Sequence, residues 1–312
     1  MSTSVAVIGA GAMGSPIAAR LHEAGFRLTV CDKNEETLAR FTGLGVATVR
    51  EASRCAAAEF VLVLVATPQQ ARDVVIGRTG VAAAVDPQRP PVVAVMSTVP
   101  ERTVVELHQS LLPLGVTVMD APVSGGVVRA EQGRLSVMAG GDAAVLEAIR
   151  PVLSVIASEI FHCGPVGSAA TTKIVNNIVG TASTLVLAEA CRIALERGLD
   201  IDSTVRVLEA SSGRTYLTGA PGEAAEFFGR VTRSRQEFDA LAAIMRKDFG
   251  LALQLAGEVG GSYPLVERLK AFADAVGDET YENWHAVGTA RPSPDNTPDQ
   301  GRSATRTTGT GA

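Results

Sequence analysis

Short apolar runs alternate with amphipathic stretches through the first half of the chain, and this alternation constrains the fold more than any other feature. The runs are almost continuously apolar, as strands must be when helices cover both faces of their sheet. They lie at residues 5–8, 28–31, 60–66, 92–96, 116–119 and 135–139. Helical patterns such as residues 15–24 and 35–44 fall between several of them. Alternation with short connections predicts an α/β fold with a doubly wound parallel sheet.

The second half of the chain has a different pattern. Residues 168–197 contain few helix breakers and predict one helix about 45 Å long at 1.5 Å per residue, with Gly198 as its C-terminal stop. Further helices are predicted at 201–210, 235–257 and 265–276, without any strand pattern. From Gly288 the sequence is rich in Thr, Pro, Gly, Ser and Arg and has almost no large apolar residue. Such a segment cannot offset its ordering entropy, so we expect a disordered tail at 288–312.

Composition and charge limit the classes of function. The chain has 312 residues, 46% of them hydrophobic and 20% charged, which is typical of a globular protein with two domains. A net charge of -5 argues against nucleic-acid binding, which needs a clustered basic face. The N-terminus lacks the basic region of a signal peptide, and the apolar run at 60–66 is too short to cross a bilayer. We expect a cytoplasmic protein without a nucleic-acid or membrane partner.

Neither the cysteines nor the histidines form a recognisable site. The cysteines lie far apart, which predicts reduced thiols; they are Cys31, Cys55, Cys163 and Cys191. The four histidines are scattered, without HxxH or HExxH spacing, and we expect no metal. A GxSxG elbow is also absent, which argues against a hydrolase.

A glycine-rich turn follows the first predicted strand. Gly9 would allow the tight turn, and Gly11 would allow the backbone to approach a pyrophosphate. Gly14 would allow the helix to pack closely on the strand. The pyrophosphate would lie on unpaired amides at the N-terminus of the next helix, where the helix dipole favours negative charge. The turn therefore predicts a Rossmann-type dinucleotide site formed by Gly9, Ala10, Gly11, Ala12, Met13 and Gly14.

An acidic residue supports this interpretation. Asp32 ends the second predicted strand, at the spacing expected for a carboxylate that binds the adenosine ribose. Asp32 favours the free ribose hydroxyls of NAD, whereas Lys33 beside it could pair with the extra phosphate of NADP. We expect NAD as the cofactor, with NADP as the alternative.

Further sequence blocks carry a resemblance to a known family. They are residues 9–25 (GAGAMGSPIAARLHEAG), 120–126 (DAPVSGG) with 133–141 (GRLSVMAGG), 164–177 (GPVGSAATTKIVNN), and Lys247-Asp248. In this order they resemble the β-hydroxyacid dehydrogenase family, the group around 3-hydroxyisobutyrate dehydrogenase and tartronate semialdehyde reductase. The resemblance extends from Val5 to about Ala286. With the patterns above, it implies a dinucleotide-binding domain at 1–163, an inter-domain helix at 164–197, and an all-helical substrate and dimerisation domain at 198–287.

The resemblance implies hydride transfer between NAD(P) and a small β-hydroxy acid or its semialdehyde or keto acid. Oxidation of an alcohol requires a base for the hydroxyl proton, and the same group serves as acid in the reverse reaction. The family lysine in this role matches Lys173, whose small and apolar neighbours fit a lysine with a lowered pKa. Asn177 lies four residues on, on the same helix face, where its amide could bind substrate and orient the ammonium. Asn176 points about 100° away and is a weaker candidate.

The remaining site residues follow from the same resemblance. Backbone amides and the hydroxyl in the loop Ser124, Gly125 and Gly126 would receive a substrate carboxylate, because successive amides in a glycine turn form an anion-binding concavity. Thr98 matches a position near the nicotinamide, and Lys247 matches the lysine that closes over cofactor and substrate. Thr67 is also expected at the cofactor, although the family usually has leucine or methionine before the proline that follows it. The segment 211–229 lacks the family's glycine–serine–tryptophan pattern, so 3-hydroxyisobutyrate-, glycerate- and threonate-like substrates all stay open.

Other functions are compatible with the same sequence. A short-chain aldehyde reductase acting on succinic semialdehyde or glyoxylate, or an imine reductase, would use the same cofactor. Imine reductases similar to this family usually replace the lysine that Lys173 matches, which disfavours that alternative. A non-catalytic dinucleotide-binding regulator would keep the fold without turnover, and the presence of both Lys173 and Asn177 argues against it. The resemblance also implies a homodimer or a higher homo-oligomer.

Overall fold

The computed structural model describes residues 3–220 and 222–290. This part of the chain divides into two compact units. The first comprises residues 3–178 and 248–267, and the second comprises residues 179–247 and 268–290. The boundaries of the predicted domains stay predictions.

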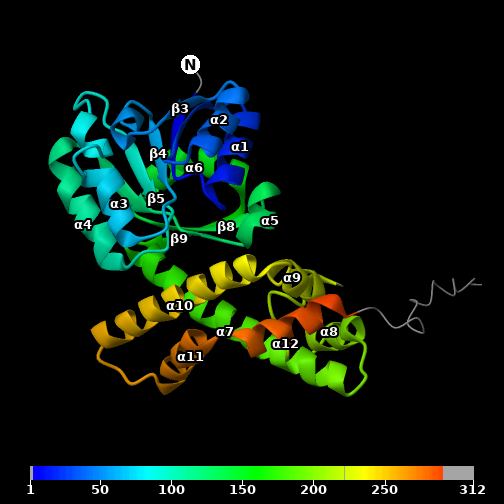
Figure 1. The fold of residues 1–312 in the computed structure, drawn as a ribbon. Helices are drawn as coiled ribbons and strands as arrows, with labels where there is room; N and C mark the ends of the chain where they lie inside the picture. The colour runs from blue at the N-terminus through cyan, green and yellow to red at the C-terminus, as the bar shows by residue number, and fades with distance from the viewer. Residues whose placement is uncertain (1–2, 221, 291–312) are drawn as a thin grey trace, which may run out of the picture. The chain divides into compact units, whose positions relative to one another are not determined.

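A mixed sheet with a large parallel part forms the frame of the first unit (Figure 1). Strands lie in the order β3-β2-β1-β4-β5-β6-β8-β7, and β9 pairs with β8. Pairing is parallel from β3 to β6 and between β8 and β9, whereas β8 is antiparallel to β6 and β7. The strands are β1 (Ser4–Ile8), β2 (Arg27–Cys31), β3 (Ala47–Val49), β4 (Phe60–Val63), β5 (Val92–Val95), β6 (Thr117–Asp120), β7 (Val123–Ser124), β8 (Leu135–Gly140) and β9 (Ala157–Gly164).

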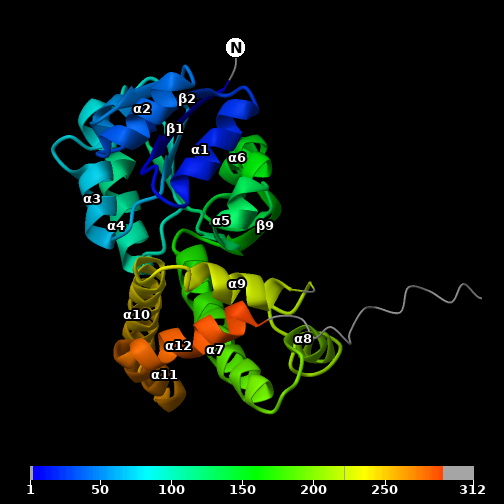
Figure 2. The ribbon, with the colours of Figure 1, turned by 45° about the vertical axis from the view of Figure 1, so that its right-hand side comes forward.

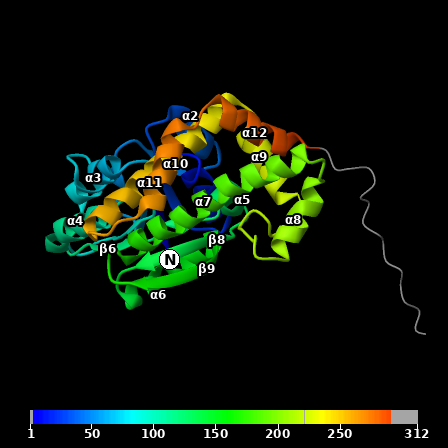
Figure 3. The same cartoon turned by 90° about the horizontal axis from the view of Figure 1, so that it is seen from below.

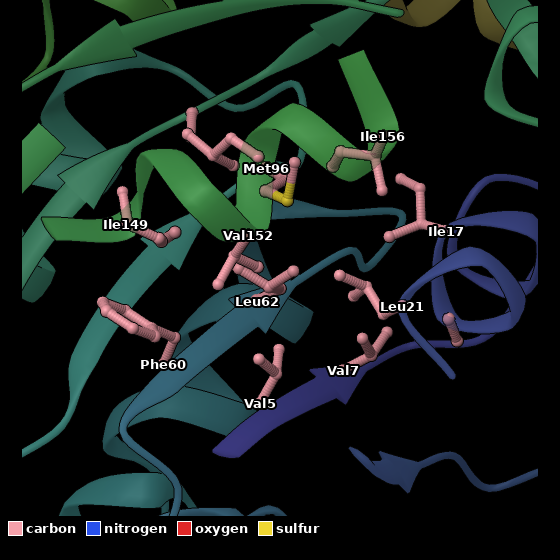
Figure 4. Packing of buried hydrophobic residues seen from close by; sticks show 14 of the residues in the cluster. Val5, Val7, Ile17, Leu21, Phe60, Leu62, Met96, Ile149, Val152 and Ile156 are labelled. Atoms are coloured by element: carbon pink, nitrogen blue, oxygen red, sulfur yellow. The ribbon is translucent and has the colours of Figure 1, made fainter. Parts of the chain in front are cut away.

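Helices cover both faces of this sheet, as the apolar strand patterns predict (Figure 2). Val5 and Val7 of β1 belong to one hydrophobic cluster, which also contains side chains of α1 (Gly14–Glu23), α2 (Glu35–Gly43) and α6 (Ala143–Ile156). Figure 4 shows part of this cluster. Ala6 and Ile8 alternate with these two residues along β1. They belong to the cluster on the opposite face, which contains side chains of α3 (Pro68–Ile76) and α4 (Glu101–Leu111). The doubly wound prediction is confirmed.

Four short elements lie between the strands and helices of the first unit. They are α5 (Gly126–Glu131) and the 3₁₀ helices η1 (Ala52–Cys55), η2 (Val81–Ala84) and η3 (Leu112–Leu114).

The strand predictions fail at the sheet margins. β3, β7 and β9 were not predicted: the first two have three and two residues, and β9 is an exposed strand without an apolar run. The prediction at 60–66 is too long, since β4 ends at Val63. Its continuation leaves the ladder because the Val65 amide donates to the hydroxyl of Ser97, at 2.8 Å.

The remaining elements are helical. They are α7 (Ser168–Glu196), α8 (Ile201–Glu209), α9 (Glu223–Val231), α10 (Arg235–Glu258), α11 (Pro264–Ala275) and α12 (Asp278–Thr289). Figure 3 shows α7 from below. Four of these helices were predicted to within one residue, whereas α9 and α12 were not predicted. Since α12 reaches Thr289, the predicted tail does not begin at Gly288; the rest of that segment, 291–312, lies outside the described residues.

Aromatic side chains form the core of the second unit. Trp284 of α12 lies edge-on to Phe228 of α9 and to Phe238 of α10, with ring centroids 5.2 and 5.7 Å apart. A Cβ on Gly288 would lie 2.2 Å from the backbone nitrogen of Gly229, so α9 and α12 approach closely at these glycines. The few aromatic residues of the chain therefore concentrate here.

The helix α7 is long and apolar enough to cross a membrane by length and composition alone. A core helix of a soluble protein passes the same test, and one such helix is weak evidence for a membrane span. The helix also carries Lys173, Asn176 and Asn177. These polar groups would be costly in a bilayer.

The four cysteines are free thiols, in agreement with the prediction. Cys31, Cys55 and Cys191 are buried. Burial raises the pKa of the Cys191 thiol to about 11, so this side chain stays protonated and unreactive at neutral pH.

Replacement of Gly14 by alanine tests the packing of α1 on the first turn. An added Cβ would lie 1.8 Å from the carbonyl oxygen of Gly9. We expect the free energy of unfolding to fall by about 1–3 kcal/mol, as in other overpacked sites, measured by urea denaturation. Gly43→Ala is the matched control, because nothing lies within 4 Å of a Cβ there, and it should cost no stability. Wild-type stability of Gly14→Ala would contradict this packing.

Candidate active site

Five parallel strands of the first unit end at the same level. Ile8 pairs with both Cys31 and Val63, Val63 pairs with Val95, and Val95 pairs with Asp120. Parallel strands in register bring the segments that follow them to one edge of the sheet, where doubly wound folds bind their ligands. Every predicted cofactor residue before position 100 follows one of these strands. The chain also reverses direction across the sheet between β1 and β4, which makes this edge a topological switch point.

The glycine turn after β1 has the three properties expected of it. Gly9 has φ +91°, and a Cβ on it would meet the carbonyl oxygen of Leu64 at 2.4 Å. Gly14 packs against Gly9 as described above. Around Gly11 nothing lies within 4 Å of a Cβ position, and Gly11 and Ala12 are exposed. The residues present therefore fit a dinucleotide pyrophosphate, which needs open backbone at this point.

Asp32 lies beside this turn. Its carboxylate accepts a hydrogen bond from the amide of Ala10 at 2.6 Å and another from the amide of Asn34 at 2.8 Å. The carboxylate thus fixes the glycine turn relative to the end of β2. Lys33 next to it is exposed. Binding of a ribose by Asp32 stays a prediction.

Thr67 and Thr98 follow β4 and β5. The Thr67 hydroxyl caps α3 by accepting from the amide of Gln70 at 3.1 Å. Thr98 is partly buried and does not cap α4, whose N-cap is Pro100. Ser97 joins the two strand ends, because its hydroxyl accepts from the amide of Val65 and donates to the carbonyl of Val63. Capping accounts for Thr67, and the role of Thr98 near the cofactor stays a prediction.

The loop after β6 contains the predicted carboxylate site. Gly125 and Gly126 have φ +130° and +73°, a conformation that favours glycine. Nothing lies within 4 Å of a Cβ position on Gly126. The hydroxyl of Ser124 accepts a hydrogen bond from the Nδ2 of Asn176 at 3.3 Å. The structure thus brings this loop to the face of α7 that carries Asn176.

Lys173 is buried, although lysines are usually exposed. Only 7% of it is accessible, and Ala169, Ala170 and Ile174 of the same helix are buried around it. Val175, which the sequence also placed among its apolar surroundings, is half exposed. Lys173 therefore lies on the buried side of α7.

Asn177 is held by two side chains. Its Nδ2 donates to Oδ2 of Asp248 at 2.8 Å, and its Oδ1 accepts from Nδ2 of Asn176 at 3.2 Å. Asp248 is itself buried. Hydrogen bonds to both ends of an amide fix its orientation. Asn176, Asn177, Ser124 and Asp248 thus form one hydrogen-bonded group in the first unit. Lys173 lies on α7 one helix turn before Asn177.

Asp120 ends β6 and is fully buried. Its carboxylate accepts hydrogen bonds from the amides of Gly167 and Ala170, at 2.8 and 2.7 Å. Burial raises the pKa of Asp120, and the hydrogen bonds from backbone amides oppose this rise. The second and third sequence blocks meet at this carboxylate.

Sequence reasoning missed several of the contacts of the candidate site. Asp120 was seen only as part of a motif, Asn176 was ranked below Asn177, and Asp248 was seen only beside Lys247. Asp120 lies 47 residues before its partner Gly167, and Asp248 lies 71 residues after its partner Asn177. Asn176 lies 52 residues after its partner Ser124. The sequence blocks that carry the family resemblance were the one indication that these residues belong to the site. Lys247 lies in α10, at the last position assigned to the second unit, and its role stays a prediction.

Comparisons with known proteins agree with this geometry. Residues 4–164 match the model of the NAD binding domain of 6-phosphogluconate dehydrogenase. Residues 167–290 match the model described as NAD-binding of NADP-dependent 3-hydroxyisobutyrate dehydrogenase. Together the two models account for nearly all of the described residues.

Individual relatives are similar over most of their length. The L-threonate dehydrogenase of Cupriavidus necator is 33% identical over 264 residues, which cover 82% of this chain and 84% of the relative. The 3-hydroxyisobutyrate dehydrogenase of Pseudomonas aeruginosa is 31% identical over 265 residues, or 84% of this chain and 88% of the relative. A solved structure of Mycobacterium tuberculosis 3-hydroxyisobutyrate dehydrogenase with L-serine aligns with a TM-score of 0.74 and 30% identity, covering 92% of this chain and 98% of that chain.

The matched models, the relatives and the sheet edge that carries the glycine turn lead to one conclusion: this chain belongs to the β-hydroxyacid dehydrogenase family.

Proposed function

We propose that this protein transfers a hydride between NAD and a small β-hydroxy acid, with Lys173 as the acid–base group. The observation that carries the proposal is the burial of Lys173 on the helix turn before Asn177, in the same helix whose Asn176 donates a hydrogen bond to Ser124 of the glycine loop. The family relatives support the class of reaction, since their names describe dehydrogenases of threonate and 3-hydroxyisobutyrate. The substrate class is a three- to four-carbon hydroxy acid.

The glycine turn and Asp32 would hold the cofactor. Amides of the turn would bind the pyrophosphate at the N-terminus of α1, and Asp32 would accept from the ribose hydroxyls. When bound, the nicotinamide supplies the acceptor or donor of the hydride. NADP is the alternative cofactor, because the exposed Lys33 could pair with its additional phosphate.

The chain's own groups then perform the remaining tasks. The amides of Gly125 and Gly126 and the hydroxyl of Ser124 bind the substrate carboxylate, which orients the carbinol carbon. The amine of Lys173 accepts the hydroxyl proton as the hydride leaves the carbon, and returns a proton in the reverse direction. Asn177, fixed by Asp248, hydrogen-bonds the reacting oxygen and keeps the amine in place.

Replacement of Lys173 by alanine tests the acid–base role. We expect turnover to fall at least about a hundredfold, the low end for a positioned acid–base group, while NADH still binds. The assay follows nicotinamide absorbance with a panel of three- and four-carbon hydroxy acids, and fluorescence titration measures NADH affinity. Lys270→Ala, at a lysine paired with Asp274 on α11, is the matched control and should retain wild-type turnover. Near-normal turnover of the Lys173 variant would remove the lysine from the mechanism.

Asp32 determines the preference between the two cofactors in this proposal. Asp32→Ala should weaken NAD more than NADP, because only NAD offers both ribose hydroxyls to the carboxylate. The measurement is the dissociation constant of each cofactor by fluorescence titration. The variant also loses the hydrogen bond that holds Ala10, which affects both cofactors. Equal losses for NAD and NADP would therefore mean that Asp32 positions the turn without binding the ribose.

A homodimer in the cytoplasm completes the proposal. In the second unit, Val179, Val186 and Ile193 of α7 are 66%, 65% and 63% exposed and lie seven residues apart, a spacing typical of helices that pack on one another. A second copy of the chain is the proposed partner. Sedimentation should give a dimer or a larger assembly, and Val186→Lys with Ile193→Lys should shift it toward the monomer. Leu112→Lys, at an exposed apolar residue of the first unit, is the control. A monomeric wild-type protein would contradict this part.

A further inference from the structure

We propose that Asp120 is a positioning residue, which fixes the start of α7 and thereby the distance from Lys173 to the carboxylate loop. The inference rests on the proposed function and adds to it a residue outside the reacting groups. Asp120 belongs to neither the cofactor turn nor the hydrogen-bonded group that contains Asn177.

The hydrogen bonds of Asp120 have the pattern of a helix cap. The first helical bond of α7 runs from the amide of Thr171 to the carbonyl of Gly167, so Gly167 occupies the N-cap position. Asp120 Oδ1 accepts from the amide of Gly167, and Oδ2 accepts from the amide of Ala170, three residues later. An N-cap side chain normally satisfies such an amide. Here a side chain from another strand takes over this task.

Gly167 cannot supply the cap itself. It has no side chain, and its φ of +97° favours glycine. A Cβ there would meet the Cγ of Glu101 at 2.6 Å. Serine and aspartate, the usual capping residues, would therefore be strained at this position, and here the cap comes from elsewhere in the chain.

The same carboxylate connects the two parts of the proposed site. Ser124 follows Asp120 by four residues, and Lys173 follows Ala170 by three residues within α7. The hydrogen bond from Asn176 to Ser124 is a second contact between α7 and the segment that follows Asp120. Movement of Asp120 would thus change the register between α7 and the loop that binds the substrate carboxylate.

The surroundings of Asp120 allow little freedom. It is fully buried, and a Cβ on Gly140 would lie 2.4 Å from its Oδ1. Burial of a carboxylate is costly unless its oxygens accept hydrogen bonds, and the positive end of the helix dipole favours the charge here. Glycine at position 140 of β8 leaves the space that the carboxylate occupies.

Asp120→Asn tests this role. The side chain of asparagine has one oxygen to accept from the amides of Gly167 and Ala170. Its NH₂ group would face the other amide, which is also a donor. We expect the single-turnover rate of hydride transfer to fall roughly ten- to a hundredfold, since small misplacements in an active site have effects of this size. The rate is measured by stopped-flow absorbance and expressed per NADH-binding site, so that a loss of folded protein does not count. The dissociation constant of NADH should stay near the wild-type value.

Two further variants separate positioning from general destabilisation. Asp142→Asn changes the exposed N-cap aspartate of α6, which accepts from Ala144, and it should leave the hydride-transfer rate unchanged. Gly140→Ala displaces the Asp120 carboxylate without removing its charge and should lower the rate as Asp120→Asn does. If Asp120→Asn fails to fold, the hydride-transfer rate of Gly140→Ala is the measurement that tests the positioning role.

The outcomes are distinct. A wild-type rate in Asp120→Asn, an equal fall in Asp142→Asn, or a parallel loss of NADH binding would overturn the positioning role. A wild-type enzyme without turnover on any hydroxy acid would instead overturn the proposed function.

Discussion

The carboxylate of Asp120 accepts two backbone hydrogen bonds in a fully buried position, at the junction of the parallel sheet and helix α7. Its strand, β6, ends in register with β5, β4, β1 and β2, and so belongs to the edge where the glycine turn and Asp32 lie. The helix on the other side carries Lys173 and Asn177. The Asp120 carboxylate therefore joins α7, the helix that carries Lys173 and Asn177, to the sheet edge that would hold the cofactor.

The polar groups of the site are arranged as a connected set within an apolar frame. Hydrophobic clusters lie on both faces of the sheet and fix the strand ends, while few polar residues of the described chain are buried. Lys173, Asp120 and Asp248 are among these exceptions. A buried polar group is costly without a partner, so each has to be justified by hydrogen bonds or by function. Such exceptions in a well-packed frame are where a protein's chemistry is usually found.

Local sequence patterns were sufficient for the central strands and for most helices. Continuous apolar runs and a glycine turn of fixed spacing are local signals, and they identified the sheet, the turn and Asp32. β9 was missed because its residues are mostly exposed and carry no apolar run, and β7 because two residues form no pattern. The contacts of Asp120 and Asp248 could not be predicted, because they join residues 47 to 71 positions apart. Lys173 was found through the resemblance of its block; composition alone would have placed it at the surface.

The most direct measurement is a crystal structure of the dead-end complex with NADH and a small β-hydroxy acid, in which neither ligand can react with the other. The account predicts the Nζ of Lys173 within about 3.2 Å of the substrate hydroxyl, and the carbinol carbon about 3–3.5 Å from the nicotinamide ring. The substrate carboxylate should lie on the Ser124–Gly126 loop. A complex in which the Lys173 side chain extends into bulk water, away from the nicotinamide, would contradict the account.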